Sequence, residues 1–217
     1  MIAAEPLPQQ MPVDVGPEIA AGLASAGLAI VRDFLPPDAI GELRAEGQRR
    51  DAAGDLVRAG VGRGAARTER ADVRGDRILW LDEGSLAPPE QRFLAALERL
   101  RGAINRAAML GLWDFEGHYA LYPPGAAYAR HRDRFRDEQG GGGERVVSCI
   151  LYLNASWRAE DGGALRIHLD ERLQRDVLPE GGTLVAFLAD RYDHEVLPAT
   201  RPRLALTGWF RRRAVRA

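Results

Sequence analysis

A histidine and an aspartate in the middle of the chain are spaced as two ligands of one metal ion. His131 and Asp133 are two residues apart, so on an extended segment both side chains leave the same face. His194 follows a strand candidate at 183–188, where a neighbouring strand can bring it alongside them. Two imidazoles and a carboxylate leave open positions on iron(II), whereas zinc more often recruits another histidine or cysteine and magnesium prefers oxygen. The spacing predicts a non-haem iron site.

An arginine follows the third candidate ligand at a suggestive distance. Arg203 begins the strand candidate at 203–213, so a tight turn at 198–202 would let Arg203 and His194 reach one interior. A buried guanidinium needs an anion, and a dicarboxylate supplies one by bidentate pairing. A surface arginine in an arginine-rich C-terminus is the alternative for Arg203 taken singly. Taken together with the spacing of the metal ligands, the position of Arg203 favours 2-oxoglutarate as a cosubstrate.

Helical patterns precede strand patterns along the chain, and both must position these residues. Helices are predicted at 17–27, 36–54 and 88–110, the last with apolar residues at helical spacing. After Trp113, short β-branched and aromatic runs broken by glycine predict an antiparallel sandwich or barrel, with the helices on one outer face. The strand candidates are 28–34, 78–81, 117–122, 126–130, 145–154, 163–168, 174–178, 183–188 and 203–213.

The length of 217 residues and a hydrophobic content of 46% allow a sizeable core. We expect a flexible tail at 1–14 and a single domain at 15–217, with helical support over about 15–112 and a β core over about 113–213. Residues 55–76 alternate glycine with arginine and show no apolar period. A loop of this length is often a lid or binding segment, and a surface insertion is the other interpretation.

Bulk properties narrow the class of partner and the compartment. The net charge of −1 argues against binding nucleic acid or anionic membranes through bulk charge. The single cysteine, Cys149, permits no intramolecular disulfide and favours a reducing compartment. No signal-peptide pattern occurs, and no apolar run reaches the roughly 18 residues that span a bilayer. We therefore expect a cytoplasmic protein without nucleic-acid or membrane partners, and the oligomeric state stays open.

A series of ordered motifs between about residues 74 and 213 resembles one enzyme family. They are Arg74-Gly-Asp-Arg-Ile-Leu-Trp80, Tyr122-Pro-Pro-Gly125, Tyr128-Ala-Arg-His-Arg-Asp133, Val147-Ser-Cys-Ile-Leu-Tyr-Leu-Asn154, Asp161-Gly-Gly-Ala-Leu-Arg166, His194-Glu-Val-Leu-Pro198 and Arg203-Leu-Ala-Leu-Thr-Gly-Trp209. The sequence resembles the prolyl 4-hydroxylases of the 2-oxoglutarate oxygenase superfamily, namely the hypoxia-sensing enzymes of animals and their bacterial counterparts. The resemblance implies an α+β fold with a double-stranded β-helix (jelly-roll, cupin-like) core and N-terminal helices on one face.

The resemblance also implies roles for individual residues. Iron would be held by His131, Asp133 and His194, and the distal carboxylate of 2-oxoglutarate by Arg203 and Tyr152. The remaining implied site residues are Tyr122 and Tyr128 beside iron and substrate, and Ser148 and Trp209 in the wall of the cosubstrate pocket. The family's mobile loop favours a lid at 55–76, and we hypothesise that Asp76 and Arg145 pair to fasten it.

The implied reaction is hydroxylation at C4 of a prolyl residue in a protein, with Fe(II), 2-oxoglutarate and O2, giving succinate and CO2, and with ascorbate as a supporting reductant. In bacterial relatives the substrate is elongation factor Tu. Hydroxylation of another residue or of a free amino acid, and a catalytically silent metal-binding module, are the alternatives.

His118 and His168 have no metal-like spacing and are expected to be ordinary strand or turn residues. The glycines at 140–143 are expected to form a hairpin connection.

Overall fold

The computed structural model describes residues 15–60, 73–133 and 143–213. The described helices are α1 (Gly16–Ala26), α2 (Pro37–Ala52) and α3 (Pro88–Ala108). The strands are β1 (Leu28–Val31), β2 (Val57–Arg58), β3 (Arg77–Trp80), β4 (Asp114–Tyr122), β5 (Tyr128–His131), β6 (Glu144–Tyr152), β7 (Leu165–His168), β8 (Gln174–Val177), β9 (Leu184–Leu188), β10 (Asp193–Val196) and β11 (Arg203–Arg212).

The helices begin and end where local chemistry favours it. Each has proline in its first turn, where the missing N–H costs no intrahelical hydrogen bond. Helix α1 ends at Gly27, whose φ of 70° is left-handed and whose N–H donates to the carbonyl of Leu23. The side chain of Glu90 accepts a hydrogen bond from the N–H of Ala87 at 2.7 Å at the start of α3. Within the described ranges, no helix has both the length and the apolar character to cross a membrane.

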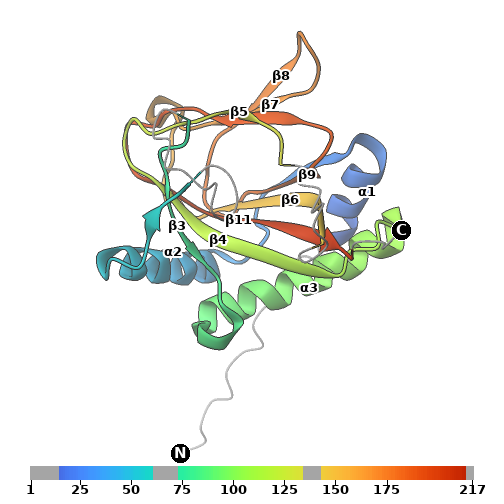
Figure 1. The fold of residues 1–217 in the computed structure, drawn as a ribbon, viewed down its shortest axis with the longest axis horizontal. Coiled ribbons are helices and arrows are strands. Elements are labelled where there is room, and N and C mark those ends of the chain that lie inside the picture. The colour runs from blue at the N-terminus through green and yellow to red at the C-terminus, as the bar shows by residue number, and fades with distance from the viewer. Residues whose placement is uncertain (1–14, 61–72, 134–142, 214–217) are drawn as a thin grey trace, which may run out of the picture.

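The strands form two antiparallel sheets that face each other. The larger sheet has the order β1-β9-β6-β11-β4-β3-β2, and the smaller one has the order β5-β10-β7-β8. In Figure 1, α2 and α3 lie below the larger sheet, α1 lies to its right, and the strands of the smaller sheet lie above it. The larger sheet is therefore the middle layer, and each of its faces packs against a different partner.

Side-chain alternation divides the core between those two faces. On the helix side, Leu204, Leu206 and Phe210 of β11 pack with residues of the helices, among them Leu97 and Ile104. The buried apolar residues that face the smaller sheet come from five strands of the larger sheet and are Ile78, Ala120, Tyr122, Ile150, Tyr152, Val185, Phe187 and Ala205. Polar side chains also occur on this second face, and it holds the candidate site.

The predicted fold class is confirmed: an antiparallel jelly-roll core carries N-terminal helices on one outer face. Strand β10 was missing from the predicted strands, because Asp193, His194 and Glu195 make it look polar. It nevertheless lies in the interior of the smaller sheet, paired with β5 and β7. The predicted loop 55–76 contains the short strand β2, and its residues 61–72 lie outside the described residues, as does the predicted tail at 1–14.

The contact between α2 and the larger sheet provides a test of this packing. A Cβ on Gly47 would lie 2.9 Å from Cε1 of buried Tyr119, whereas a Cβ on Gly41 would meet nothing within 4 Å. We expect Gly47→Ala to lower the free energy of unfolding by about 1–2 kcal/mol through overpacking. The matched control Gly41→Ala should leave it unchanged or raise it by up to about 1 kcal/mol. Denaturant unfolding measures both, and equal stability of the two variants would contradict the packing.

Candidate active site

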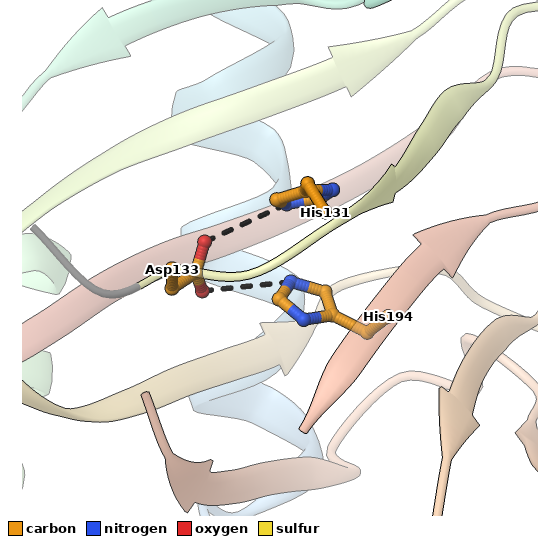
Figure 2. Close-up of side chains that lie close together, drawn as sticks. All are labelled: His131, Asp133 and His194. Atoms are coloured by element: carbon orange, nitrogen blue, oxygen red, sulfur yellow. Dashed lines mark ion pairs between the residues drawn. The ribbon is translucent and has the colours of Figure 1, made fainter. Parts of the chain in front are cut away.

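Three side chains from two neighbouring strands converge between the sheets. Strands β5 and β10 pair so that His131 lies opposite His194, with their ring centroids 4.2 Å apart. Asp133 follows β5, and its Oδ1 and Oδ2 lie 3.5 Å from Nε2 of His131 and of His194, respectively. One ligand atom from each residue lies within 4.8 Å of the others. Figure 2 shows the carboxylate facing the two imidazoles, with one oxygen directed at each. The three side chains can hold one metal ion.

Backbone carbonyls orient both imidazoles for metal binding. The Nδ1 atom of His131 lies 2.8 Å from the carbonyl oxygen of Ala129, and that of His194 lies 3.4 Å from the carbonyl of Tyr192. A carbonyl oxygen only accepts, so each neutral ring carries its proton on Nδ1 and donates it there. Burial lowers the pKa of His194, which favours this neutral form. The lone pairs on Nε2 remain directed at the shared centre, as metal ligation requires.

The carboxylate of Asp133 is buried, ionised and held in place. Burial alone would raise its pKa, but attraction to His194 and His131 in their protonated forms holds the pKa of Asp133 well below its usual range, and a bound metal cation would replace that positive charge when the rings are neutral. Its Oδ2 accepts a hydrogen bond from the hydroxyl of Ser148 at 2.8 Å. Ser148 belongs to β6 and lies opposite Trp209 of β11. The larger sheet thus orients a ligand that follows a strand of the smaller sheet.

A second group of polar atoms lies deeper on the same face of the sheet. The side chain of Arg203 is 2% exposed, and its Nε donates to the carbonyl of Gly163 at 2.9 Å. Its Nη2 atom and the hydroxyl of Tyr152 are buried without a hydrogen-bond partner among the described residues. The guanidinium lies 5.0 Å from the ring centroid of Tyr152 and 5.2 Å from that of Tyr122.

These unpaired donors fit an acidic ligand. A guanidinium keeps its positive charge in proteins, and burying that charge without an anion is costly. Burial raises the pKa of Tyr152, so its phenol remains a hydrogen-bond donor. A carboxylate placed between Arg203 and Tyr152 would satisfy both groups. The residues present therefore suit the distal carboxylate of 2-oxoglutarate as well as the metal.

The other predicted site residues converge on the same region, with one correction. Tyr128 stacks on His131 with ring centroids 3.7 Å apart. The hypothesis that Asp76 pairs with Arg145 is wrong. Both carboxylate oxygens of Asp76 accept hydrogen bonds from Arg74, at 2.6 and 2.9 Å. The guanidinium of Arg145 instead donates to Glu116 at 2.7 Å and lies 3.5 Å from the ring centroid of Trp209.

Three residues beside this site were not predicted to belong to it. Arg74 lies 4.8 Å over the ring of Tyr128, and its Nη2 lies 3.4 Å from Nε2 of His118. His118 is buried between the rings of Trp80 and Trp209, with centroids 4.7 and 5.6 Å away. Arg74 and Trp80 are the first and last residues of the motif at 74–80, so the sequence offered a reason to include them in the site. It offered no such reason for His118, because the position of His118 beside the site depends on the pairing of β3, β4 and β11.

Comparisons with known proteins agree with this arrangement. Residues 117–211 match the family described as the 2OG-Fe(II) oxygenase superfamily. A prolyl-4-hydroxylase from Pseudomonas putida, known from its crystal structure, is 47% identical, with a TM-score of 0.83 over 91% of this chain and 100% of that chain. This chain belongs to the 2OG-Fe(II) oxygenase superfamily. Fe(II), 2-oxoglutarate and O2 are the cofactors of this superfamily, and the site described above suits them.

Two further relatives of this oxygenase come from animals. Human Egl nine homolog 1 is 36% identical over 149 residues, a match that covers 64% of this chain and 33% of the human protein. The chain thus spans about a third of that relative's length. A Trichoplax adhaerens prolyl hydroxylase, solved with a peptide fragment of the hypoxia inducible factor oxygen degradation domain, is 25% identical, with a TM-score of 0.79 over 91% of this chain and 89% of that chain.

The hydrogen bond from Ser148 to Asp133 provides a test of the metal centre. We expect Ser148→Ala to weaken Mn(II) binding by about tenfold or more, because the carboxylate loses the group that orients it. Titration calorimetry without oxygen measures the affinity. Ser25→Ala, which removes an exposed hydroxyl from α1, is the control and should bind as the original chain does. Unchanged affinity in Ser148→Ala would show that the hydroxyl does not support a metal ligand.

The unpaired donors of Arg203 and Tyr152 provide a test of the cosubstrate site. We expect Arg203→Leu to weaken 2-oxoglutarate binding to the Mn(II)-loaded protein by roughly 10- to 100-fold, and Tyr152→Phe by about three- to tenfold. Arg201→Leu is the matched control, since its side chain is 39% exposed and donates to the carbonyl of Ala155. Calorimetric titration with 2-oxoglutarate gives each affinity. Equal binding by the Arg203 and Arg201 variants would contradict the assignment.

Proposed function

We propose that this oxygenase hydroxylates a prolyl residue of a protein substrate at C4, using 2-oxoglutarate and O2. The observation that carries the proposal is the combination of two sets of groups between the sheets. One is the convergent set His131, Asp133 and His194, and the other is the buried pair of unpartnered donors on Arg203 and Tyr152. The 47% identity to the Pseudomonas putida prolyl-4-hydroxylase supports the proline as the target.

In this proposal each side chain has a defined task. His131, Asp133 and His194 hold Fe(II), while Arg203 and Tyr152 hold the distal carboxylate of 2-oxoglutarate. When bound, iron and 2-oxoglutarate supply the oxidant that places one oxygen atom of O2 on a substrate carbon and the other in succinate, with release of CO2. Tyr128 keeps the ring of His131 in place by stacking on it. The two sheets keep bulk water away from the reacting groups.

Elongation factor Tu is the first protein substrate to test, because the motifs resemble those of bacterial prolyl hydroxylases. The same reasoning makes the partner a protein or peptide that presents a proline. The Trichoplax adhaerens prolyl hydroxylase was solved with a peptide fragment of a protein, which supports a peptide-binding role for this site. The cytoplasm, predicted from the single cysteine, is the compartment that we propose for such a substrate.

Oxygen transfer to proline can be measured directly. Iron-loaded protein with 2-oxoglutarate is incubated with bacterial lysate and, separately, with purified elongation factor Tu. We expect mass spectrometry to find one added oxygen atom on a proline, with succinate formed alongside it. Asp133→Ala should abolish both products through loss of iron. His168→Ala should retain them, because that imidazole pairs with Glu195 instead of joining the metal cluster.

Other outcomes would identify the alternatives. Oxygen added to a different residue, or only to a free amino acid, would replace proline as the target while keeping the reaction. Absence of succinate under every condition would favour a metal-binding module without catalytic activity. Modification of another protein but not of elongation factor Tu would reject that substrate alone.

A further inference from the structure

A cluster of three charged side chains lies on the outer side of the smaller sheet, behind the candidate metal ligands. The carboxylate of Asp193 accepts hydrogen bonds from two guanidiniums. Its Oδ2 accepts from Arg130 at 2.9 and 3.1 Å, and its Oδ1 accepts from Arg132 at 2.7 Å. Asp193 begins β10, Arg130 belongs to β5, and Arg132 directly follows β5. We call these three residues the clasp, because they join the two strands that carry the ligands.

Each member of the clasp is a neighbour in sequence of a candidate ligand. Arg130 and Arg132 stand on either side of His131, and Asp193 precedes His194. Successive side chains of an extended segment point to opposite faces. The ligands therefore point between the sheets while their neighbours point outward. The clasp thus connects the same two strands from the side opposite the metal.

Few backbone contacts fix these two strands relative to each other at the site. In the described part of the chain, β5 pairs with β10 at two registered positions, His194 with His131 and Val196 with Tyr128, and the register shifts between them. Asp133 lies beyond the end of β5, past the last of these positions. The position of Asp133 relative to His194 therefore depends on side-chain contacts more than on the backbone ladder.

The clasp joins more groups than an isolated surface ion pair does. Isolated exposed pairs contribute little, and the side chains of Arg130 and Arg132 are about half exposed. Here, however, both oxygens of one carboxylate are bound, and Arg132 also donates to the carbonyl of Asp190 at 3.3 Å. Fixed geometry matters at this place, because a metal site needs its ligand atoms within about 0.5 Å of the productive arrangement.

We propose that Asp193, through Arg130 and Arg132, sets the spacing of the ligands on the two strands and thereby raises the affinity of the site for Fe(II). Asp193 is a positioning residue, since its side chain points away from the metal centre and acts through its two partners. Ser148 supports Asp133 from inside the sheets, and the clasp holds the strand of that ligand from outside. This inference rests on the metal-binding role proposed for the triad and is independent of which substrate carbon receives oxygen.

Removal of the carboxylate should weaken metal binding while the protein stays folded. We expect Asp193→Ala to raise the Kd for Mn(II) about three- to tenfold in titration calorimetry without oxygen. Asp193→Glu, which keeps a carboxylate, should recover most of this loss. Asp176→Ala is the matched control and should bind as the original chain does. Its carboxylate accepts two hydrogen bonds from Arg166 at 2.8 Å in the same sheet, on β8, two strands away from β10.

A comparison of stability with metal affinity separates positioning from a merely structural role. Denaturant unfolding of the metal-free proteins should give similar midpoints for Asp193→Ala and Asp176→Ala, since each loses surface ion pairs. Their Kd values for Mn(II) should nevertheless differ. Arg132→Leu alone should raise the Kd by a smaller factor than Asp193→Ala does. Added to Asp193→Ala it should change nothing further, because its partner is already gone.

Salt provides a measurement that includes the original chain. Exposed ion pairs are screened between roughly 0.05 and 1 M NaCl, where the Debye length falls to about 3 Å. The Kd for Mn(II) of the original chain and of Asp176→Ala should rise more over this range than that of Asp193→Ala, which has no clasp to lose.

Three results would overturn the inference. They are equal Kd values for Asp193→Ala and Asp176→Ala, equal salt dependence of all three proteins, and a loss of affinity that Asp193→Glu does not recover. His194→Ala tests the foundation separately and should abolish Mn(II) binding. If His194→Ala binds Mn(II) as the original chain does, the proposed metal site fails instead.

Discussion

The site depends above all on the pairing of β5 with β10. This pairing sets His131 opposite His194 and brings Asp133 against both, although the two strands are separated in the chain by β6 to β9. A slip of one residue in either strand would turn its side chains to the opposite face. Outward-facing ion pairs from Arg130 and Arg132 to Asp193 tie the same two strands together on the other side.

The larger sheet allows a polar site and a stable core to coexist. Its helix-facing side is filled by apolar residues such as Leu206 and Phe210, which are fully or almost fully buried. Its other side carries Arg203, His118 and Ser148 between the sheets. Unpaired polar atoms on that side oppose folding by about 1–3 kcal/mol each. The apolar face offsets this cost, and bound ligands would remove it.

The polar groups of the site form two regions with different neighbours. Arg203 and Tyr152 lie where β6 and β11 are covered, which suits a small acid enclosed on every side. Arg74, His118 and Trp80 lie toward the β3 edge, where the sheet is more open. The Arg74–Asp76 ion pair links this edge to Tyr128, and through its stacking to His131. A substrate bound at this edge would therefore be connected to the candidate metal ligand His131 through Arg74 and Tyr128.

Local spacing in the sequence was enough to predict the pair His131 and Asp133, the helices on one face and the β core, whereas His194 joins the pair only through the pairing of β5 with β10. Alternation along an extended segment places His131 with Asp133, and proline and glycine mark the helix ends whatever the neighbours are. Only the tertiary structure decided that Asp76 pairs with Arg74, that polar β10 lies inside a sheet, and that His118 belongs to the site. These features depend on which distant strands become neighbours and in what register, and no local pattern carries that information.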